Sequence, residues 1–150
     1  MFKKLIHDNY EIILKEYKDL SKEQKLKLKE IDLEINTNQL NTKKLTRTVL
    51  SKLQIILINE FVIGFFAPEM EYDDFYGYYR VEPLKITNNW KNKGISFVVL
   101  SNFYKDKNGL AYIYTENINS IKLFTKLGFL ETDLLIDKFN FGKWYIKKIN

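Results

Sequence analysis

Cysteine is absent from the 150-residue sequence, and histidine occurs once, as His7. The lack of cysteine excludes disulfide bonds, thiolate metal sites and a cysteine nucleophile. A single histidine argues against a histidine-based zinc site and against a catalytic serine–histidine pair. We therefore expect no bound metal, and the sequence assigns no role to His7.

Long apolar runs are also missing, because no stretch approaches the roughly 20 residues that a membrane span needs. The first 20 residues are basic at the start, soon carry acidic residues, and lack a small-residue cleavage site. That pattern is not typical of a signal peptide. We expect a cytoplasmic protein that does not bind a membrane.

Charge of one sign does not gather on any segment. Lys and Arg number 24 against 19 Asp and Glu, which gives a net charge of +5. Because the lysines are spread along the chain, nucleic acid is not expected as a partner. A small anionic ligand explains a few of the positive charges more simply. The length predicts one domain over residues 1–150. We expect a monomer or a homodimer.

The start of the chain is predicted to be helical after a short strand at residues 1–6. Asp8 or Asn9 is expected to cap a helix whose apolar residues recur at helical spacing. This stripe consists of Tyr10, Ile13, Leu14, Tyr17 and Leu20.

A second helix is predicted from Ser21, which is followed three residues later by Gln24. The pair has the spacing of a capping box, and the helix is expected to end near Ile35. Residues 36–41 form an expected polar loop, and a third short helix is expected from Thr42.

From Leu53 onward the apolar pattern changes to that of strands alternating with helices. Asn59 and Glu60 separate two apolar runs, which predicts a hairpin. The expected strands are residues 54–58, 61–66, 75–86, 110–115, 129–137 and 143–149, and the expected helices are residues 93–104 and 117–127. A mixed α/β fold follows.

The turn after Ile86 lies between an expected strand and an expected helix. Such a turn leaves several backbone N–H groups unpaired at the positive end of the helix dipole, which suits a phosphate or pyrophosphate. Lys91 and Lys93 flank the turn, and Gly94 lets the backbone approach a ligand. A strand–turn–helix with one glycine is also a common plain connection.

A second segment of interest begins at Asn117. This residue is a plausible N-cap for a helix that buries Ile121, Phe124 and Leu127 and ends at Gly128.

Together the two segments resemble the two motifs of the GNAT N-acetyltransferase family. The first motif matches at Ile86, Trp90, Lys91, Gly94 and Ser96, and the second at Asn117, Ser120, Leu127, Gly128 and Phe129. The resemblance covers roughly residues 53–149, and it includes a hairpin around Gly64 and a closing strand at Trp144.

The resemblance implies an α/β fold with a central mixed, mostly antiparallel twisted sheet. The sheet is flanked by helices, is splayed between its fourth and fifth strands, and here would follow a helical N-terminal third. It also implies acetyl-CoA as co-substrate, with the pantetheine arm in the splay. The implied coenzyme A contacts are Ile86, Thr87, Lys91, Asn92, Lys93, Gly94, Ile95, Ser96, Asn117 and Ser120.

Three positions depart from the family pattern. Lys91 replaces the usual Gln or Arg, and Ser96 replaces the usual second Gly or Ala. Phe124 stands where many members carry the Tyr that protonates the departing thiolate. Loss of a general acid costs about 10²–10⁴-fold in rate, unless a water, Tyr112 or Tyr114 replaces it.

On the acceptor side, Glu82 is the candidate base, within the strand beside the expected thioester. It could instead point to solvent, since Pro83 predicts a bulge there. Acidic residues in the preceding turn could steer a cationic amine, or form only a solvated loop. They are Glu69, Glu71, Asp73 and Asp74.

Three functions are compatible with these residues. The first is transfer of an acetyl group from acetyl-CoA to a primary amine, of a small molecule or a protein. The second is a catalytically weak or inactive module that binds acyl-CoA, which Phe124 favours. The third is a protein-interaction module with the same fold.

Overall fold

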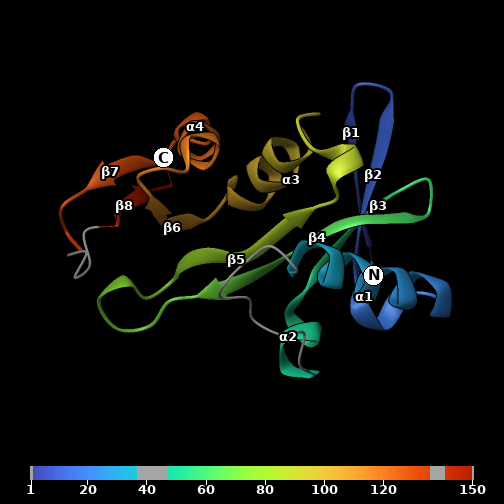
Figure 1. The fold of residues 1–150 in the computed structure, drawn as a ribbon. Helices are drawn as coiled ribbons and strands as arrows, with labels where there is room; N and C mark the ends of the chain where they lie inside the picture. Colours follow the sequence, from blue (N-terminus) through green and yellow to red (C-terminus); the bar gives the residue numbers. More distant parts are fainter. Residues whose placement is uncertain (1, 37–46, 136–140, 150) are drawn as a thin grey trace. The chain divides into compact units, whose positions relative to one another are not determined.

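The computed structural model describes residues 2–36, 47–135 and 141–149 (Figure 1). The chain divides into two compact units. The first unit comprises Met1–Pro68 and Val81–Ile95, and the second comprises Glu69–Arg80 and Ser96–Asn150. Strands β4 (Phe61–Met70) and β5 (Tyr78–Ile86) contribute residues to both units. A single domain over residues 1–150 stays a prediction.

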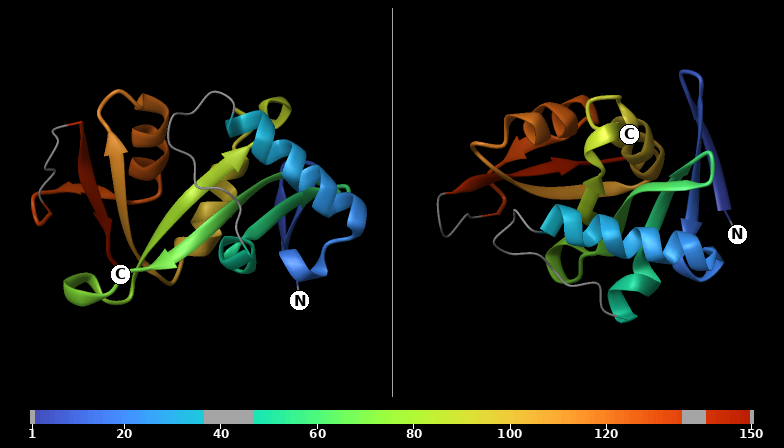
Figure 2. Two further views of the ribbon diagram at one scale, coloured as in Figure 1. Left: turned by 60° about the horizontal axis from the view of Figure 1, so that its bottom comes forward. Right: turned by 45° about the vertical axis from the view of Figure 1, so that its right-hand side comes forward.

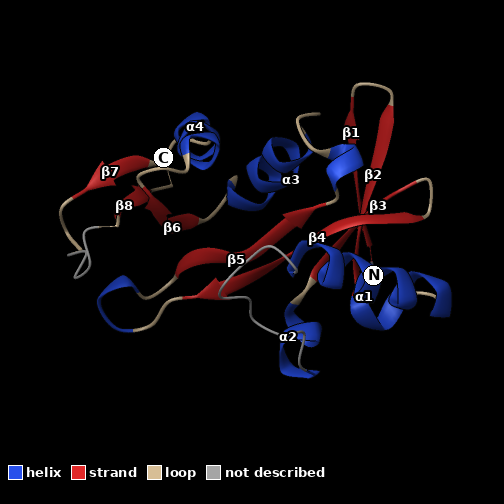
Figure 3. Ribbon diagram, viewed as in Figure 1, coloured by secondary structure: helices blue, strands red, loops and turns tan. Residues whose placement is uncertain are grey.

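The first unit is built on antiparallel strands, drawn in red in Figure 3. Strands β1 (Phe2–His7), β2 (Tyr10–Glu16), β3 (Gln54–Ile58) and β4 pair in this order, each antiparallel to the next. The helical segments of this unit are η1 (Tyr17–Asp19), α1 (Lys22–Asn36), α2 (Arg47–Lys52) and η3 (Asn88–Trp90), of which η1 and η3 are short 3-10 helices.

Residues 10–16 form a strand, so the prediction of a helix capped by Asp8 or Asn9 is wrong, and the predicted helical N-terminal third is not supported because the chain starts with two strands. Asp8 instead lies in the turn of the β1–β2 hairpin, with a positive φ of 51° that aspartate tolerates. Ile12 and Leu14 are buried two residues apart, at strand spacing. Strand β2 pairs with β1 and β3, and this pairing outweighs the local helical pattern.

The predicted capping box is confirmed. The N–H of Ser21 donates to Gln24 Oε1 at 2.9 Å, and the N–H of Gln24 donates to Ser21 Oγ at 3.1 Å. The side chain of Gln24 also donates to the carbonyl oxygen of Glu60, which ties the start of α1 to the β3–β4 turn. The expected loop after Asn36 and the helix start near Thr42 fall at residues 37–46, outside the described ranges.

Helix α1 lies across one face of the strands of the first unit (Figure 2). It contributes Leu28 and Ile31, which are fully buried. Burial of a Leu or Ile side chain stabilises a fold by about 1.5–3 kcal/mol, so this face anchors the helix. The core cluster consists of Leu20, Leu28, Ile31, Leu53, Ile55, Leu57, Val62, Phe65 and Ala67.

The β3–β4 hairpin turns at Asn59 and Glu60, as predicted, and both have positive φ angles (52° and 69°). These angles are those of the type I′ turn that two-residue hairpins favour. The register shifts between Ile56 and Leu57, so Ile63 on β4 forms a bulge. The carbonyl oxygen of Ile63 accepts the N–H of Thr87 at 2.8 Å, at the end of β5.

The second unit contains strands β6 (Asn108–Tyr114), β7 (Leu130–Thr132) and β8 (Gly142–Lys147). Strand β8 pairs antiparallel with both β6 and β7, whereas β6 pairs parallel with the start of β5. The strands are accompanied by η2 (Asp73–Phe75), α3 (Ile95–Tyr104) and α4 (Ile118–Lys126). The α/β class with a mixed, mostly antiparallel sheet and flanking helices is thus confirmed. Among the helices that the structure describes, none is long and apolar enough to cross a membrane.

Aromatic rings form the centre of the second unit. Tyr104 packs edge-to-face on Phe103 and on Phe129, with centroids 4.9 and 5.0 Å apart, and Phe129 packs in the same way on Phe124 at 5.1 Å. The hydroxyl of Tyr104 donates to the carbonyl oxygen of Tyr79 at 3.0 Å. Burial raises the pKa of this phenol, partly offset by the Arg80 guanidinium, so the hydroxyl stays protonated and the bond persists.

Replacement of Gly64 by alanine is expected to destabilise the first unit. A Cβ there would overlap the carbonyl oxygen of Lys85 and come within 2.9 Å of Ile86 Cδ1. The backbone of β5 cannot move aside easily. We therefore expect the free energy of unfolding to fall by an amount near or above the upper end of the roughly 1–3 kcal/mol typical of overpacking. Urea unfolding measures it. Gly77→Ala is the control, since a Cβ there meets nothing within 4 Å and strains only a φ of 86°. A Gly64→Ala loss smaller than that of Gly77→Ala would contradict the prediction.

Candidate functional site

The predicted turn between β5 and α3 is present, and it is held by its own backbone. The N–H of Trp90 donates to the carbonyl oxygen of Thr87 at 3.0 Å, and the N–H of Lys91 donates to that of Asn88 at 3.3 Å. Asn92 and Gly94 have positive φ angles of 62° and 78°. We call residues 87–95 the amide loop.

Three consecutive N–H groups of the amide loop are available to a ligand. In the ranges that the structure describes, the backbone N–H groups of Asn92, Lys93 and Gly94 donate to no acceptor of the protein. These residues are exposed. The first N–H groups of α3 likewise lack a partner within the helix, and they lie at the positive end of its dipole. The loop can therefore bind an anion.

Two lysines add positive charge to the amide loop. Lys91 and Lys93 are both exposed, and Lys93 Nζ lies 5.8 Å from the centroid of the Trp90 ring. The Trp90 ring is packed edge-on against Tyr10 of β2, with centroids 5.1 Å apart. Trp90 is therefore part of the packing that holds the loop on the N-terminal hairpin.

His7, to which the sequence assigns no role, contacts the amide loop directly. Its ring Nε2–H donates to the carbonyl oxygen of Lys93 at 2.7 Å. A Cβ on Gly94 would lie 3.0 Å from the same nitrogen, so this glycine serves close packing as well as its positive φ. The contact spans 86 residues of sequence, and no local pattern signals it.

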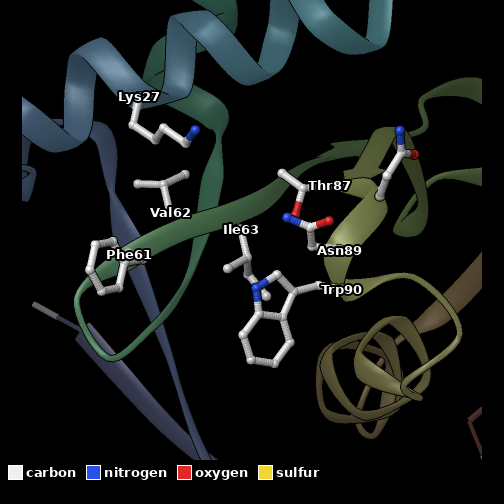
Figure 4. Close-up of a pocket in the computed structure, with 8 residues that line it drawn as sticks. Lys27, Phe61, Val62, Ile63, Thr87, Asn89 and Trp90 are labelled. Atoms are coloured by element: carbon white, nitrogen blue, oxygen red, sulfur yellow. The ribbon is translucent and has the colours of Figure 1, made fainter.

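A pocket of the first unit borders the amide loop (Figure 4). The close-up shows Lys27 of α1 reaching towards it, with the rings of Phe61 and Trp90 and the side chains of Thr87 and Asn89 around it. Val62 and Ile63, both buried, form its apolar part.

The second predicted motif lies in the second unit. Asn117 is the N-cap of α4, as predicted, and its Oδ1 accepts the N–H of Ser120 at 3.1 Å. Phe124 is 9% exposed and packs on Phe129. That Asn117 and Ser120 contact coenzyme A, and that position 124 faces its sulfur, stay predictions.

The candidate replacements for the missing acid lie on β6. Tyr112 and Tyr114 point to one face of the strand, and their ring centroids are 5.6 Å apart. Tyr112 also packs against Trp144 at 5.3 Å, whereas Tyr114 is largely exposed. The Arg80 guanidinium lies over the Trp144 ring at 5.5 Å.

The side chain of Glu82, in β5, lies outside the described residues, so its role as a base stays a prediction. Of the acidic turn, Asp73 and Asp74 are exposed, while Glu71 approaches Arg80 at 3.4 Å. In the part of the chain that the structure describes, no group of three or more His, Asp or Glu side chains could hold a metal.

The structure places the predicted coenzyme residues in two groups. The first unit holds Ile86, Thr87 and residues 91–95 on one continuous segment, and the second unit holds Ser96, Asn117 and Ser120.

Several solved structures that match this chain are acetyltransferases. A GNAT-family acetyltransferase from Bacillus cereus matches with a TM-score of 0.68 and 12% identity, over 93% of this chain and 98% of that one. An acetyltransferase from Agrobacterium tumefaciens matches with a TM-score of 0.66 and 9% identity, over 99% and 95%. The chain has the GNAT fold.

The GNAT fold also relates the chain to Naa50 from Arabidopsis thaliana, solved in complex with the bisubstrate analogue CoA-Ac-MVNAL. That match has a TM-score of 0.55 and 18% identity, over 90% of this chain and 96% of that one. No protein-family model matches the sequence, and neither does any curated protein. At these identities the likeness establishes the GNAT fold alone.

Within this GNAT fold, Asn117→Ala is expected to lower the free energy of unfolding by about 0.5–2 kcal/mol, because α4 loses its N-cap. Asn117→Asp keeps an oxygen acceptor for the N–H of Ser120 and should stay within a few tenths of a kcal/mol, by roughly the same scale. Thermal or urea unfolding of both variants measures the difference. If Asn117→Ala were as stable as Asn117→Asp, the hydrogen bond would not be stabilising α4.

Proposed function

We propose that this protein transfers an acetyl group from acetyl-CoA to a primary amine. The observation that carries the proposal is the amide loop, where the N–H groups of Asn92, Lys93 and Gly94 have no protein acceptor in the described ranges. Such a loop at the start of α3 suits the pyrophosphate of coenzyme A. The GNAT fold supports acetyl-CoA as the ligand.

The assignment of residues follows from the two motifs. Residues 92–96 would bind the pyrophosphate through backbone N–H groups and Lys91 through its side-chain charge, since the Lys91 N–H donates to Asn88, while Ile86 and Thr87 at the end of β5 would lie beside the pantetheine arm. Within the second unit, β5 and β6 pair in parallel at Tyr78 with Asn108 and at Tyr79 with Gly109. Asn117 would reach the pantetheine arm or the acetyl end, and Ser120 would contact the coenzyme. A cytoplasmic location is part of the same proposal.

The reaction forms a C–N bond and breaks the thioester C–S bond. An alkyl amine has a pKa near 10.4, so becoming the neutral nucleophile costs about 4–5 kcal/mol at pH 7. Glu82 or a chain of waters would accept that proton. The leaving thiol resembles that of cysteine, with a pKa near 8.5, so its thiolate leaves without a strong acid. The remaining rate enhancement would come from the placement of the two reactants and from backbone N–H groups that donate to the oxyanion.

A second function, an acyl-CoA-binding module without efficient turnover, is favoured by one observation. Phe124, which by the sequence resemblance would stand in the place of the usual acid, is packed against Phe129. Its ring has no proton to give to a thiolate. The binding module and the enzyme share the coenzyme site, so binding and turnover have to be measured separately.

Coenzyme A is expected to bind the protein saturably and to raise its melting temperature. Lys91→Glu should weaken this binding by about tenfold or more, because it reverses a charge beside the pyrophosphate. Isothermal calorimetry gives the affinity. Lys29→Glu, at an exposed position of α1, makes the same change in net charge and should bind as the wild type. No saturable binding of coenzyme A by the wild type would remove the proposal. Equal effects of the two variants would show that the phosphates bind elsewhere.

Phe124→Tyr distinguishes the enzyme from the binding module. If the missing acid limits the rate and the ring edge reaches the sulfur, kcat with acetyl-CoA and a panel of primary amines should rise about tenfold or more. The affinity for coenzyme A should change little. Phe129→Tyr, at a fully buried neighbour, should only destabilise the second unit and serves as the control. Binding of acetyl-CoA without turnover in the wild type and in Phe124→Tyr would favour the binding module.

A further inference from the structure

The N-terminal hairpin holds the amide loop at two points. Strands β1 and β2 close with His7 opposite Tyr10 in the register. His7 donates to the carbonyl oxygen of Lys93, and the Tyr10 ring packs against Trp90. The tip of one hairpin therefore contacts the loop before and after Lys91.

The bond from His7 also sets the direction of an N–H group. A peptide unit is planar and trans, so its carbonyl oxygen and its N–H point in opposite directions. The carbonyl oxygen of Lys93 and the N–H of Gly94 belong to the same unit. Because His7 holds the Lys93 oxygen on its own side at 2.7 Å, the Gly94 N–H must point away from the hairpin. That N–H has no acceptor within the described part of the protein.

Gly94 fits the same arrangement. Its φ of 78° is an angle that residues with a side chain rarely adopt. A Cβ at this position would lie 3.0 and 3.2 Å from two atoms of the His7 ring. The imidazole ring occupies the space that a side chain at position 94 would need. Position 7 and position 94 are therefore constrained by each other.

We propose that His7 is a positioning residue for the pyrophosphate of coenzyme A, which acts by holding the Lys93–Gly94 peptide so that its N–H faces the ligand. The inference rests on the proposed function, since it concerns the same amide loop. His7 touches neither the ligand nor the reacting atoms in this role. Its effect is on the affinity for ligands that carry a pyrophosphate.

Variants of His7 separate the hydrogen bond from ring packing. Gln places its side-chain N–H₂ about where Nε2 lies, whereas the N–H₂ of Asn falls short, near the position of Nδ1. Phe keeps a ring against Gly94 but removes the donor. Asp8→Asn is the matched control, because it removes the carboxylate 3.6 Å from His7 Nε2, and asparagine accepts the positive φ of that turn.

The experiment measures the dissociation constants of coenzyme A and of pantetheine, which lacks the pyrophosphate. In His7→Phe and His7→Asn, loss of one hydrogen bond is expected to raise the dissociation constant of coenzyme A about three- to tenfold. His7→Gln should restore most of the affinity, and Asp8→Asn should leave it unchanged. Pantetheine should bind all of these variants alike.

Different results would overturn different claims. If the wild type binds coenzyme A and His7→Phe and His7→Asn bind it equally well, the role of His7 is wrong while the proposed function stands. If the His7 variants bind coenzyme A and pantetheine more weakly by the same factor, His7 has a general structural role, and the inference is also overturned. A wild type that binds no coenzyme A removes the proposed function and the inference together. If His7→Phe does not fold, the comparison of Gln with Asn decides.

Discussion

The hydrogen bond from the N–H of Thr87 to the carbonyl oxygen of Ile63 fixes where β5 ends in the first unit. The acceptor, Ile63, is the residue that the β3–β4 register skips, so the bond lies at the bulge of β4. The neighbouring Gly64 is needed because β5 passes too close for a side chain. The amide loop begins at Thr87, so its starting point is set by the packing of β4 on β5.

From that starting point the loop is shaped by local bonds and by one distant support. The turn at Thr87–Lys91 closes through backbone bonds within the loop. The N-terminal hairpin then supplies His7 and Tyr10 from the other end of the chain. The internal bonds end at Lys91, so the contacts of His7 and Tyr10 add support where the loop makes no backbone bonds of its own.

Local patterns in the sequence predicted the elements that depend on local chemistry. Ser21 and Gln24 marked the start of α1, Asn59 and Glu60 marked the hairpin, and Asn117 marked the N-cap of α4. The strand β2 was mistaken for a helix because its apolar residues fit both periods, and only its neighbours β1 and β3 decide between them. His7 was missed because its partner lies 86 residues away. The amide loop could be predicted from its place between a strand and a helix. The contacts of His7 and Tyr10 with the loop could not be predicted, because they join residues far apart in the sequence.

The sequence contains two tryptophans, and each unit holds one of them. Trp90 lies in the amide loop, with Lys93 Nζ over its ring. Trp144 lies on β8, with the Arg80 guanidinium over its ring. Indole fluorescence responds to the charges and the water around the ring. With Trp144 replaced by phenylalanine, the remaining emission reports on the loop alone, and with Trp90 replaced it reports on the second unit. The protein thus carries a separate optical label in each of its two units, without any added dye.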